Sequence, residues 1–218
     1  GAKAFGWKEA RARAPQAGHI KRGVGVAAGM WQGGNGGPPA TAIVKLFADG
    51  SANLNMGASD LGCGTKTWGA QIVAEELGVP VERISVEHAD TGTTQFATPS
   101  GGSKTVPTES PAIRAAALDV KQQLLLMAAD HLKLPASDLE VRGGEVVSKS
   151  DPSKKATIGQ IPAFGRRALL VGIGYRGPNP PGKAINPFAV QFAEVEVNTK
   201  TGEIKVLRFV AAHDSGRV

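Results

Sequence analysis

The chain is poor in cysteine, in aromatic residues and in long hydrophobic runs. Cys63 is the only cysteine among 218 residues, so neither an intramolecular disulfide nor a four-cysteine zinc site can form. Aromatic side chains make up 5% of the residues and do not alternate with a basic stripe, which argues against a platform for stacking nucleic-acid bases. No apolar run reaches about 18 residues, so no membrane span is expected.

The composition is that of a globular protein with a basic excess. Hydrophobic residues form 41% of the chain and charged residues 20%, which allows a core in one or two domains. Lys and Arg outnumber Asp and Glu by 25 to 19, but the positive residues are scattered and define no nucleic-acid footprint. The start has no initiator Met and no apolar signal core, and the end follows directly on an apolar run. We therefore expect a segment of a longer protein, and its cellular compartment stays open.

Apolar patterning predicts a mixture of strands and helices. Strands are expected at residues 23–31, 41–48, 51–56, 82–88, 168–175, 188–198 and 204–212. Helices are expected at residues 67–77, 107–132 and 157–164, with a helical turn at 137–140. Hairpin turns are expected at Asp49-Gly50, at Gly143-Gly144 and at residues 199–203. Residues 32–39, 149–156 and 176–183 are interpreted as loops, and Thr108 is a candidate N-cap with Pro111 in the first helical turn.

A glycine-rich segment lies between a predicted strand and the helix predicted at 67–77. Residues 56–67 read Met-Gly-Ala-Ser-Asp-Leu-Gly-Cys-Gly-Thr-Lys-Thr. Glycines let a ligand approach the backbone, and free N–H groups at a helix start attract phosphate. The spacing matches neither a Walker loop nor the Gly-x-Gly-x-x-Gly dinucleotide pattern. A ligand loop and a structural tight turn are therefore both open.

A second segment of the same kind precedes the long helix. Residues 98–105 read Thr-Pro-Ser-Gly-Gly-Ser-Lys-Thr, within an irregular stretch at 89–106 that is long for a compact domain. Two helix starts with N–H and hydroxyl donors could hold both ends of an extended phosphorylated cofactor. Two ordinary capped loops are the alternative.

Several motifs together carry a family resemblance. A Gly-x-Gly-x-x-Thr loop at 62–67 leads into Ala-Gln-Ile-Val-Ala-Glu-Glu-Leu-Gly-Val-Pro at 70–80, and an Asp-Thr pair follows at 90–91. The end carries Phe-Ala-Glu-Val-Glu-Val at 192–197, Thr-Gly-Glu at 201–203 and Ala-Ala-His-Asp-Ser-Gly-Arg-Val at 211–218. The chain thus resembles the molybdenum-binding large subunit of the xanthine dehydrogenase and aldehyde oxidase family, the molybdenum hydroxylases. The Ser-Gly-Gly-Ser at 100–103 is most similar to the bacterial aldehyde-oxidoreductase branch, which includes isoquinoline-oxidoreductase-like proteins.

The resemblance implies which residues would contact the cofactor. A molybdopterin-type cofactor, with the cytosine dinucleotide form left open, would lie against Gly62, Cys63, Gly64, Thr65, Thr67, Ser100, Gly101, Gly102, Ser103 and Thr105. Many family members carry Gln where this chain has Cys63, whose thiol is shorter and a weaker donor. We interpret Cys63 as a small buried hydrophobe and not as a molybdenum ligand. The four histidines have no ligand spacing and are interpreted as structural or surface residues.

The resemblance also implies which parts of the enzyme are missing. In the family an essential glutamate acts as the catalytic base, and it would lie beyond Val218. No catalytic residue is therefore assigned to this segment, and its carboxylates are not promoted to that role: Glu75, Glu76, Glu109 and Glu194. We expect the isolated chain to be inactive.

We predict an α+β fold with mixed, largely antiparallel sheets and helices packed on one face. An N-terminal connector is expected at 1–22, a cofactor-binding lobe at 23–160 and a C-terminal strand segment at 161–218. The predicted function is that of a molybdenum hydroxylase segment acting on an aldehyde or N-heterocycle, with iron–sulfur and flavin groups on partner modules. A non-catalytic scaffold domain that supports subunit assembly is the alternative.

Overall fold

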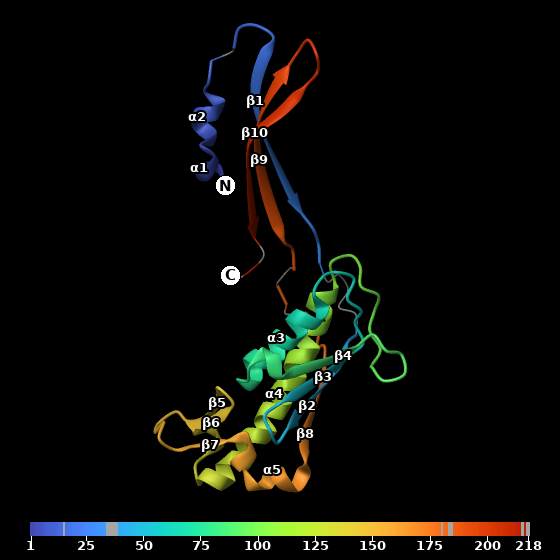
Figure 1. The fold of residues 1–218 in the computed structure, drawn as a ribbon, viewed down its shortest axis with the longest axis vertical. Helices are drawn as coiled ribbons and strands as arrows, with labels where there is room; N and C mark the ends of the chain where they lie inside the picture. Colours follow the sequence, from blue (N-terminus) through green and yellow to red (C-terminus); the bar gives the residue numbers. More distant parts are fainter. Residues whose placement is uncertain (15, 34–38, 180, 183–184, 215, 217–218) are drawn as a thin grey trace. The chain divides into compact units, whose positions relative to one another are not determined.

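The computed structural model describes residues 1–14, 16–33, 39–179, 181–182, 185–214 and 216 (Figure 1). The chain divides into two compact units, one formed by Gly1–Gly33 with Ala184–Val218 and the other by Gly34–Lys183. Both ends of the sequence thus contribute to the same unit. These boundaries do not coincide with the expected divisions at residues 22 and 160. Most of the expected loop at 32–39, and part of that at 176–183, lies outside the described residues.

A four-stranded sheet forms the centre of the Gly34–Lys183 unit. Its order is β4-β3-β2-β8, with bounds Ile84–His88, Ala52–Met56, Thr41–Phe47 and Leu169–Tyr175. β2 is antiparallel to β3 and β8. β3 and β4 are parallel, and a helix supplies the crossover connection that a parallel pair requires. The predicted Asp49-Gly50 hairpin is confirmed: Gly50 has a φ of 80°, and the Asp49 carboxylate accepts the Ser51 N–H at 2.8 Å.

Two helices, α3 (Thr65–Leu77) and α4 (Thr105–Leu132), cover one face of this sheet (Figure 1). The close approach of α4 to β8 depends on glycines at alternate positions of that strand. A Cβ on Gly172 would lie 2.3 Å from the Ala116 backbone oxygen, and one on Gly174 would lie 2.0 Å from that of Ala112. Larger residues at these positions would push the helix away from the sheet.

The start of α4 differs from the prediction. The N-cap is Lys104 instead of Thr108, which is buried inside the helix, and Pro111 is an interior residue. A helix can begin before Pro107, because N–H groups in the first turn have no acceptor within the helix. Pro111 cannot donate to the carbonyl one turn earlier, and Arg176 Nε donates to that Pro107 oxygen at 3.2 Å instead.

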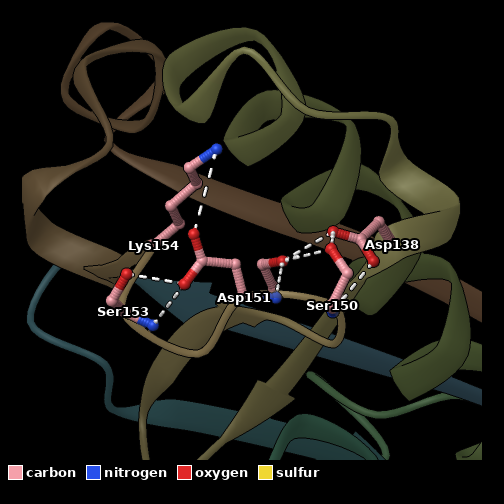
Figure 2. Close-up of polar contacts among 6 residues, drawn as sticks. Asp138, Ser150, Asp151, Ser153 and Lys154 are labelled. Carbon is pink, nitrogen blue, oxygen red and sulfur yellow. Dashed lines mark hydrogen bonds and ion pairs between the residues drawn. The ribbon is translucent and has the colours of Figure 1, made fainter.

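A small antiparallel sheet follows α4, with order β5-β6-β7 and bounds Leu139–Arg142, Glu145–Ser148 and Lys155–Thr157. Asp138, at the end of the 3-10 turn η2 (Ala136–Asp138), holds the start of the turn between β6 and β7. Asp138 Oδ2 accepts the hydroxyls of Ser148 at 2.6 Å and Ser150 at 2.9 Å (Figure 2). These hydrogen bonds lower the pKa of Asp138. The predicted loop at 149–156 is thus a tightly hydrogen-bonded turn that runs into β7, and η3 (Ile158–Gln160) and α5 (Pro162–Arg167) follow.

The other unit is a three-stranded antiparallel sheet. Its order is β1-β9-β10, with bounds Ile20–Met30, Phe188–Asn198 and Ile204–Asp214. Two short helices, α1 (Ala2–Phe5) and α2 (Trp7–Arg11), precede β1. The rings of Phe5 and Phe192 stack with 5.6 Å between their centres, and Trp7 meets Phe192 edge-on.

The predicted α+β class, with largely antiparallel sheets and helices on one face, is confirmed. Among the described residues, no helix combines the length and apolar character needed to cross a membrane.

Candidate functional site

The first glycine-rich loop, residues 57–64, joins β3 to α3 and is shaped by one aspartate. Asp60 Oδ1 accepts the backbone N–H of Gly62 at 2.9 Å and that of Gly64 at 3.1 Å. Gly62 has a φ of 95° and Gly64 a φ of 71°, values that residues with a Cβ rarely adopt. The turn itself therefore requires both glycines, and α3 begins directly after it.

Asp60 places a negative charge where the sequence predicts a bound anion. Desolvation raises the pKa of Asp60, but hydrogen bonds from the N–H groups of Gly62 and Gly64 outweigh it, and the pKa lies below its ordinary value. Two of the N–H groups that the sequence assigns to a phosphate thus bind this carboxylate. The exposed tip of the turn, where Gly62 and Cys63 lie, is the part of this loop that a ligand can still reach.

Cys63 lies at that tip and is exposed. Its Sγ atom is 3.2 Å from the Thr65 hydroxyl, and this hydrogen bond lowers the pKa of the Cys63 thiol below its ordinary value. The interpretation of Cys63 as a buried hydrophobe is wrong, because the turn places residue 63 away from the core. An exposed thiol at this position can hydrogen-bond to a ligand.

The second loop, residues 89–104, joins β4 to α4 (Figure 1). Its first part is a turn in which the Asp90 carboxylate accepts the Gly92 N–H at 2.8 Å. Asn55 at the end of β3 holds this turn, because its Nδ2 atom donates to the Thr93 backbone oxygen at 3.1 Å and to Glu87 Oε2 at 2.8 Å. The loop is long but anchored to the sheet.

The two predicted loops meet at the backbone oxygen of Ser59. This oxygen accepts hydrogen bonds from Thr65 Oγ1 at 3.3 Å and from Ser100 Oγ at 3.0 Å. A second contact lies at Gly57, where a Cβ would be only 1.9 Å from the backbone oxygen of Gln95. Segments that are separate in the sequence therefore form one continuous candidate site.

The exposure of the ten predicted contact residues divides them by role. Six are exposed: Gly62, Cys63, Thr67, Gly101, Gly102 and Ser103. Thr65 is fully buried, and its hydroxyl bonds within the first loop. Ser100 is partly buried and links the loops, while Gly64 and Thr105 are partly buried at the helix starts. Ser100 holds the two loops together, Thr65 stabilises the first loop, and the six exposed residues lie on the surface of the loops.

Gly101 differs from the other glycines of the candidate site. Gly62, Gly64 and Gly102 adopt positive φ, and glycine suits them for that reason alone. Gly101 does not, and a Cβ built on it would meet no protein atom within 4 Å. Neither its backbone nor its packing in this chain requires a glycine. The missing side chain leaves open space beside the loop.

Several buried polar atoms of this unit were not found from the sequence. Within the described part of the Gly34–Lys183 unit, these atoms have no hydrogen-bond partner: Asn53 Oδ1, Asn55 Oδ1, Trp68 Nε1, Gln95 Oε1, Thr108 Oγ1 and Glu109 Oε2. Glu109 is 1% exposed, and burial raises its pKa to about 7. Its spacing from the buried residues Ala112 and Ile113, three and four positions later, is the signal that could have indicated its burial.

The described histidines and carboxylates do not form a metal site. Among the residues that the structure describes, no group of three or more His, Cys, Asp or Glu side chains is placed to hold a metal ion. His88 has a structural contact, since its Nδ1 lies 3.2 Å from the Ala58 backbone oxygen in the first loop.

The chain is similar in sequence and fold to known proteins. The family model of the molybdopterin cofactor-binding domain matches residues 1–218. The chain is 33% identical over 180 residues to the carbon monoxide dehydrogenase large chain of Hydrogenophaga pseudoflava, covering 79% of this chain and 22% of that one. It is 30% identical over 220 residues to the aldehyde oxidoreductase molybdenum-binding subunit PaoC of Escherichia coli, covering 100% of this chain and 29% of the relative.

A solved structure agrees with these relatives. The reconstituted CO dehydrogenase from Oligotropha carboxidovorans superposes with a TM-score of 0.79 and 27% identity, over 98% of this chain and 27% of that one. The chain therefore spans less than a third of the length of the proteins that it resembles.

Proposed function

We propose, from the premise that this chain belongs to the family of molybdopterin cofactor-binding domains, that its two glycine-rich loops hold a molybdopterin-type cofactor. The whole protein would be an oxidoreductase that hydroxylates an aldehyde or N-heterocyclic substrate with oxygen derived from water. When bound, the cofactor supplies the redox chemistry of that reaction. This chain supplies the binding surface.

The observation that carries the proposal is the meeting of the two loops at Ser59, with open space beside Gly101. Ser100 of the second loop donates to the Ser59 backbone oxygen of the first loop, which also accepts the Thr65 hydroxyl, so the two loops are in contact. Gly101 leaves room there that no protein atom fills. A planar, polar cofactor needs close backbone approach and several hydrogen-bonding groups, and this surface offers both.

The residues of this chain would have separate tasks. The Cys63 thiol and the Ser103 hydroxyl are exposed and can hydrogen-bond to the cofactor. Asp60 fixes the first loop before any ligand arrives, because its carboxylate already holds two of the loop's N–H groups. Such preorganisation lowers the entropy lost on binding. No catalytic residue is assigned within this segment.

The names of two relatives indicate which kind of partners this chain would have. The carbon monoxide dehydrogenase relative is named a large chain, and another, from Paenarthrobacter nicotinovorans, is a subunit of a 6-hydroxypseudooxynicotine dehydrogenase complex. We propose that this chain works with further segments of its own subunit and with partner modules that carry iron–sulfur and flavin groups. Mass spectrometry of the released cofactor would distinguish its cytosine dinucleotide form from molybdopterin without the nucleotide.

The test uses Gly101→Ala in the full-length protein within its native complex. This substitution adds one methyl group that meets no protein atom and requires no unusual φ, so the fold should be unchanged. We expect lower molybdenum content and less releasable pterin, measured by elemental analysis and by fluorescence of the oxidised pterin. Gly25→Ala on β1, where a Cβ also meets no atom within 4 Å, is the matched control.

Two outcomes would contradict the proposal. Full cofactor occupancy in Gly101→Ala would show that the loops do not form the cofactor site. A natural complex that contains no molybdenum and no pterin would favour the alternative, a scaffold domain that only supports assembly.

A further inference from the structure

A cavity of about 520 Å³ lies in the unit formed by Gly1–Gly33 and Ala184–Val218. Its walls are the segment after α2, the first residues of β1 and the side chain of Glu194 on β9. Four cationic side chains line it: Arg11, Arg13, Lys21 and Arg22. A concave surface with an excess of one charge concentrates its field and attracts ligands of the opposite charge.

The one carboxylate in the wall is neutralised by neighbouring arginines. Glu194 is 5% exposed, pairs with Arg13 through Oε1, and accepts a hydrogen bond from Arg208 Nη2 at 3.1 Å through Oε2. The Arg208 guanidinium also lies over the Phe5 ring, with its Cζ 4.3 Å from the ring centre. Two cations thus bind one buried anion, and Glu194 positions Arg13 at the cavity wall.

The other cations keep hydrogen-bond donors for a ligand. Arg11 lies over the Trp7 ring with its Cζ 5.7 Å from the ring centre, and no hydrogen bond to another described residue uses its donors. Arg22 Nε donates to Glu196 Oε2 at 2.9 Å, and Lys21 donates to a backbone oxygen. A guanidinium has five N–H donors and an ammonium three, so each cation retains unused ones.

We propose that this cavity binds a phosphate group, either as inorganic phosphate or as the ester of a small molecule. Four cations and one carboxylate line the cavity. Arg208 and Glu196 lie outside the lining and pair with Glu194 and Arg22, so five cations meet two carboxylates in all. This excess of positive charge matches a dianion better than a monocarboxylate. Arginine also presents two parallel N–H groups that fit phosphate oxygens. The cavity lies outside Gly34–Lys183, which contains the proposed cofactor loops, so each proposal can fail without the other.

The test is isothermal titration of the full-length protein in its native complex with inorganic phosphate, glycerol 3-phosphate and acetate. We expect saturable binding of at least one phosphate ligand, weaker binding at high ionic strength, and much weaker binding of acetate. Equal affinity for both phosphate ligands indicates free phosphate as the ligand. Binding of glycerol 3-phosphate alone indicates a phosphorylated small molecule.

Substitutions of the exposed cations that line the cavity test whether the cavity is the phosphate-binding site. Arg11→Gln and Arg22→Gln should each weaken phosphate binding by about tenfold or more, since each removes a charged donor. Arg22→Lys should have an intermediate affinity, because it keeps the charge but loses the planar pair of donors. Lys200→Gln, an exposed cation in the turn between β9 and β10 and outside the cavity, is the matched control and should bind as the unchanged protein does. Absence of saturable phosphate binding, or unchanged affinity in both glutamine variants, would overturn the proposal.

Discussion

Replacement of Glu109 by glutamine should remove most of the pH dependence of α4 stability between pH 4.5 and about 7. The Glu109 side chain is 1% exposed, and its Oε2 atom has no hydrogen-bond partner. Desolvation therefore raises its pKa from 4.5 to about 7. A rise of this size corresponds to about 3 kcal/mol of difference between the protonated and ionised forms in the folded protein.

The sign of the effect follows from the direction of the pKa change. The folded state binds the proton more tightly than the unfolded state, so the stabilisation is complete below pH 4.5. It is lost as the pH rises to about 7 and stays lost above that value. Glutamine has nearly the same shape and no charge. At pH 8, Glu109→Gln should therefore be more stable than the unchanged protein by up to about 3 kcal/mol, with little difference at pH 4.

Hydrogen exchange of peptides that cover α4 measures this local stability in the full-length protein. Variant and unchanged protein are compared at the same pH, so the intrinsic exchange rates cancel. Glu75→Gln, which removes an exposed carboxylate from the neighbouring helix α3, is the control and should have no such effect. A stability difference in Glu109→Gln that is equal at pH 5 and pH 8, or that favours Glu109 at pH 8, would refute the burial argument.

Two further predictions concern packing and the first loop. Gly174→Ala places a Cβ 2.0 Å from the Ala112 backbone oxygen, and we expect it to lower the free energy of unfolding by about 1–3 kcal/mol in urea denaturation. Gly177→Ala, where no atom lies within 4 Å, should be neutral. Gly64→Val forces a β-branched residue to a φ of 71°, so the full-length enzyme should lose pterin cofactor. Cys63→Ala should retain more of it, and equal pterin content in both variants would contradict the proposed loop.

Features set by neighbouring residues could be predicted from the sequence. The Asp49-Gly50 hairpin and the helix ending before Gly78 depend on turn and capping chemistry within a few residues, and both are present in the structure. The start of α4 was misplaced because Pro107 is tolerated in a first turn, and because Arg176, far away in the sequence, replaces the donor that Pro111 lacks.

Features that depend on distant partners could not be predicted. Ile20 of β1 lies opposite Asn198 of β9, and no local pattern indicates that pairing. The two candidate loops were recognised from glycine and hydroxyl content, but their meeting at Ser59 depends on how β3 and β4 pair. Residue type also did not reveal burial: Cys63 is exposed and Glu109 is buried, which is the reverse of what each side chain prefers.

The pairing of β1 with β9 also governs the order in which the chain can fold during synthesis. The ribosome produces β1 before all of Gly34–Lys183, and its partner strand only afterwards. Until then β1 has two unpaired edges, which are sites of non-native association. Its glycines and the charges of its own residues Lys21 and Arg22 lower its tendency to pair wrongly. Of these two units, the one that contains β1 therefore starts before Gly34–Lys183 and is completed after it.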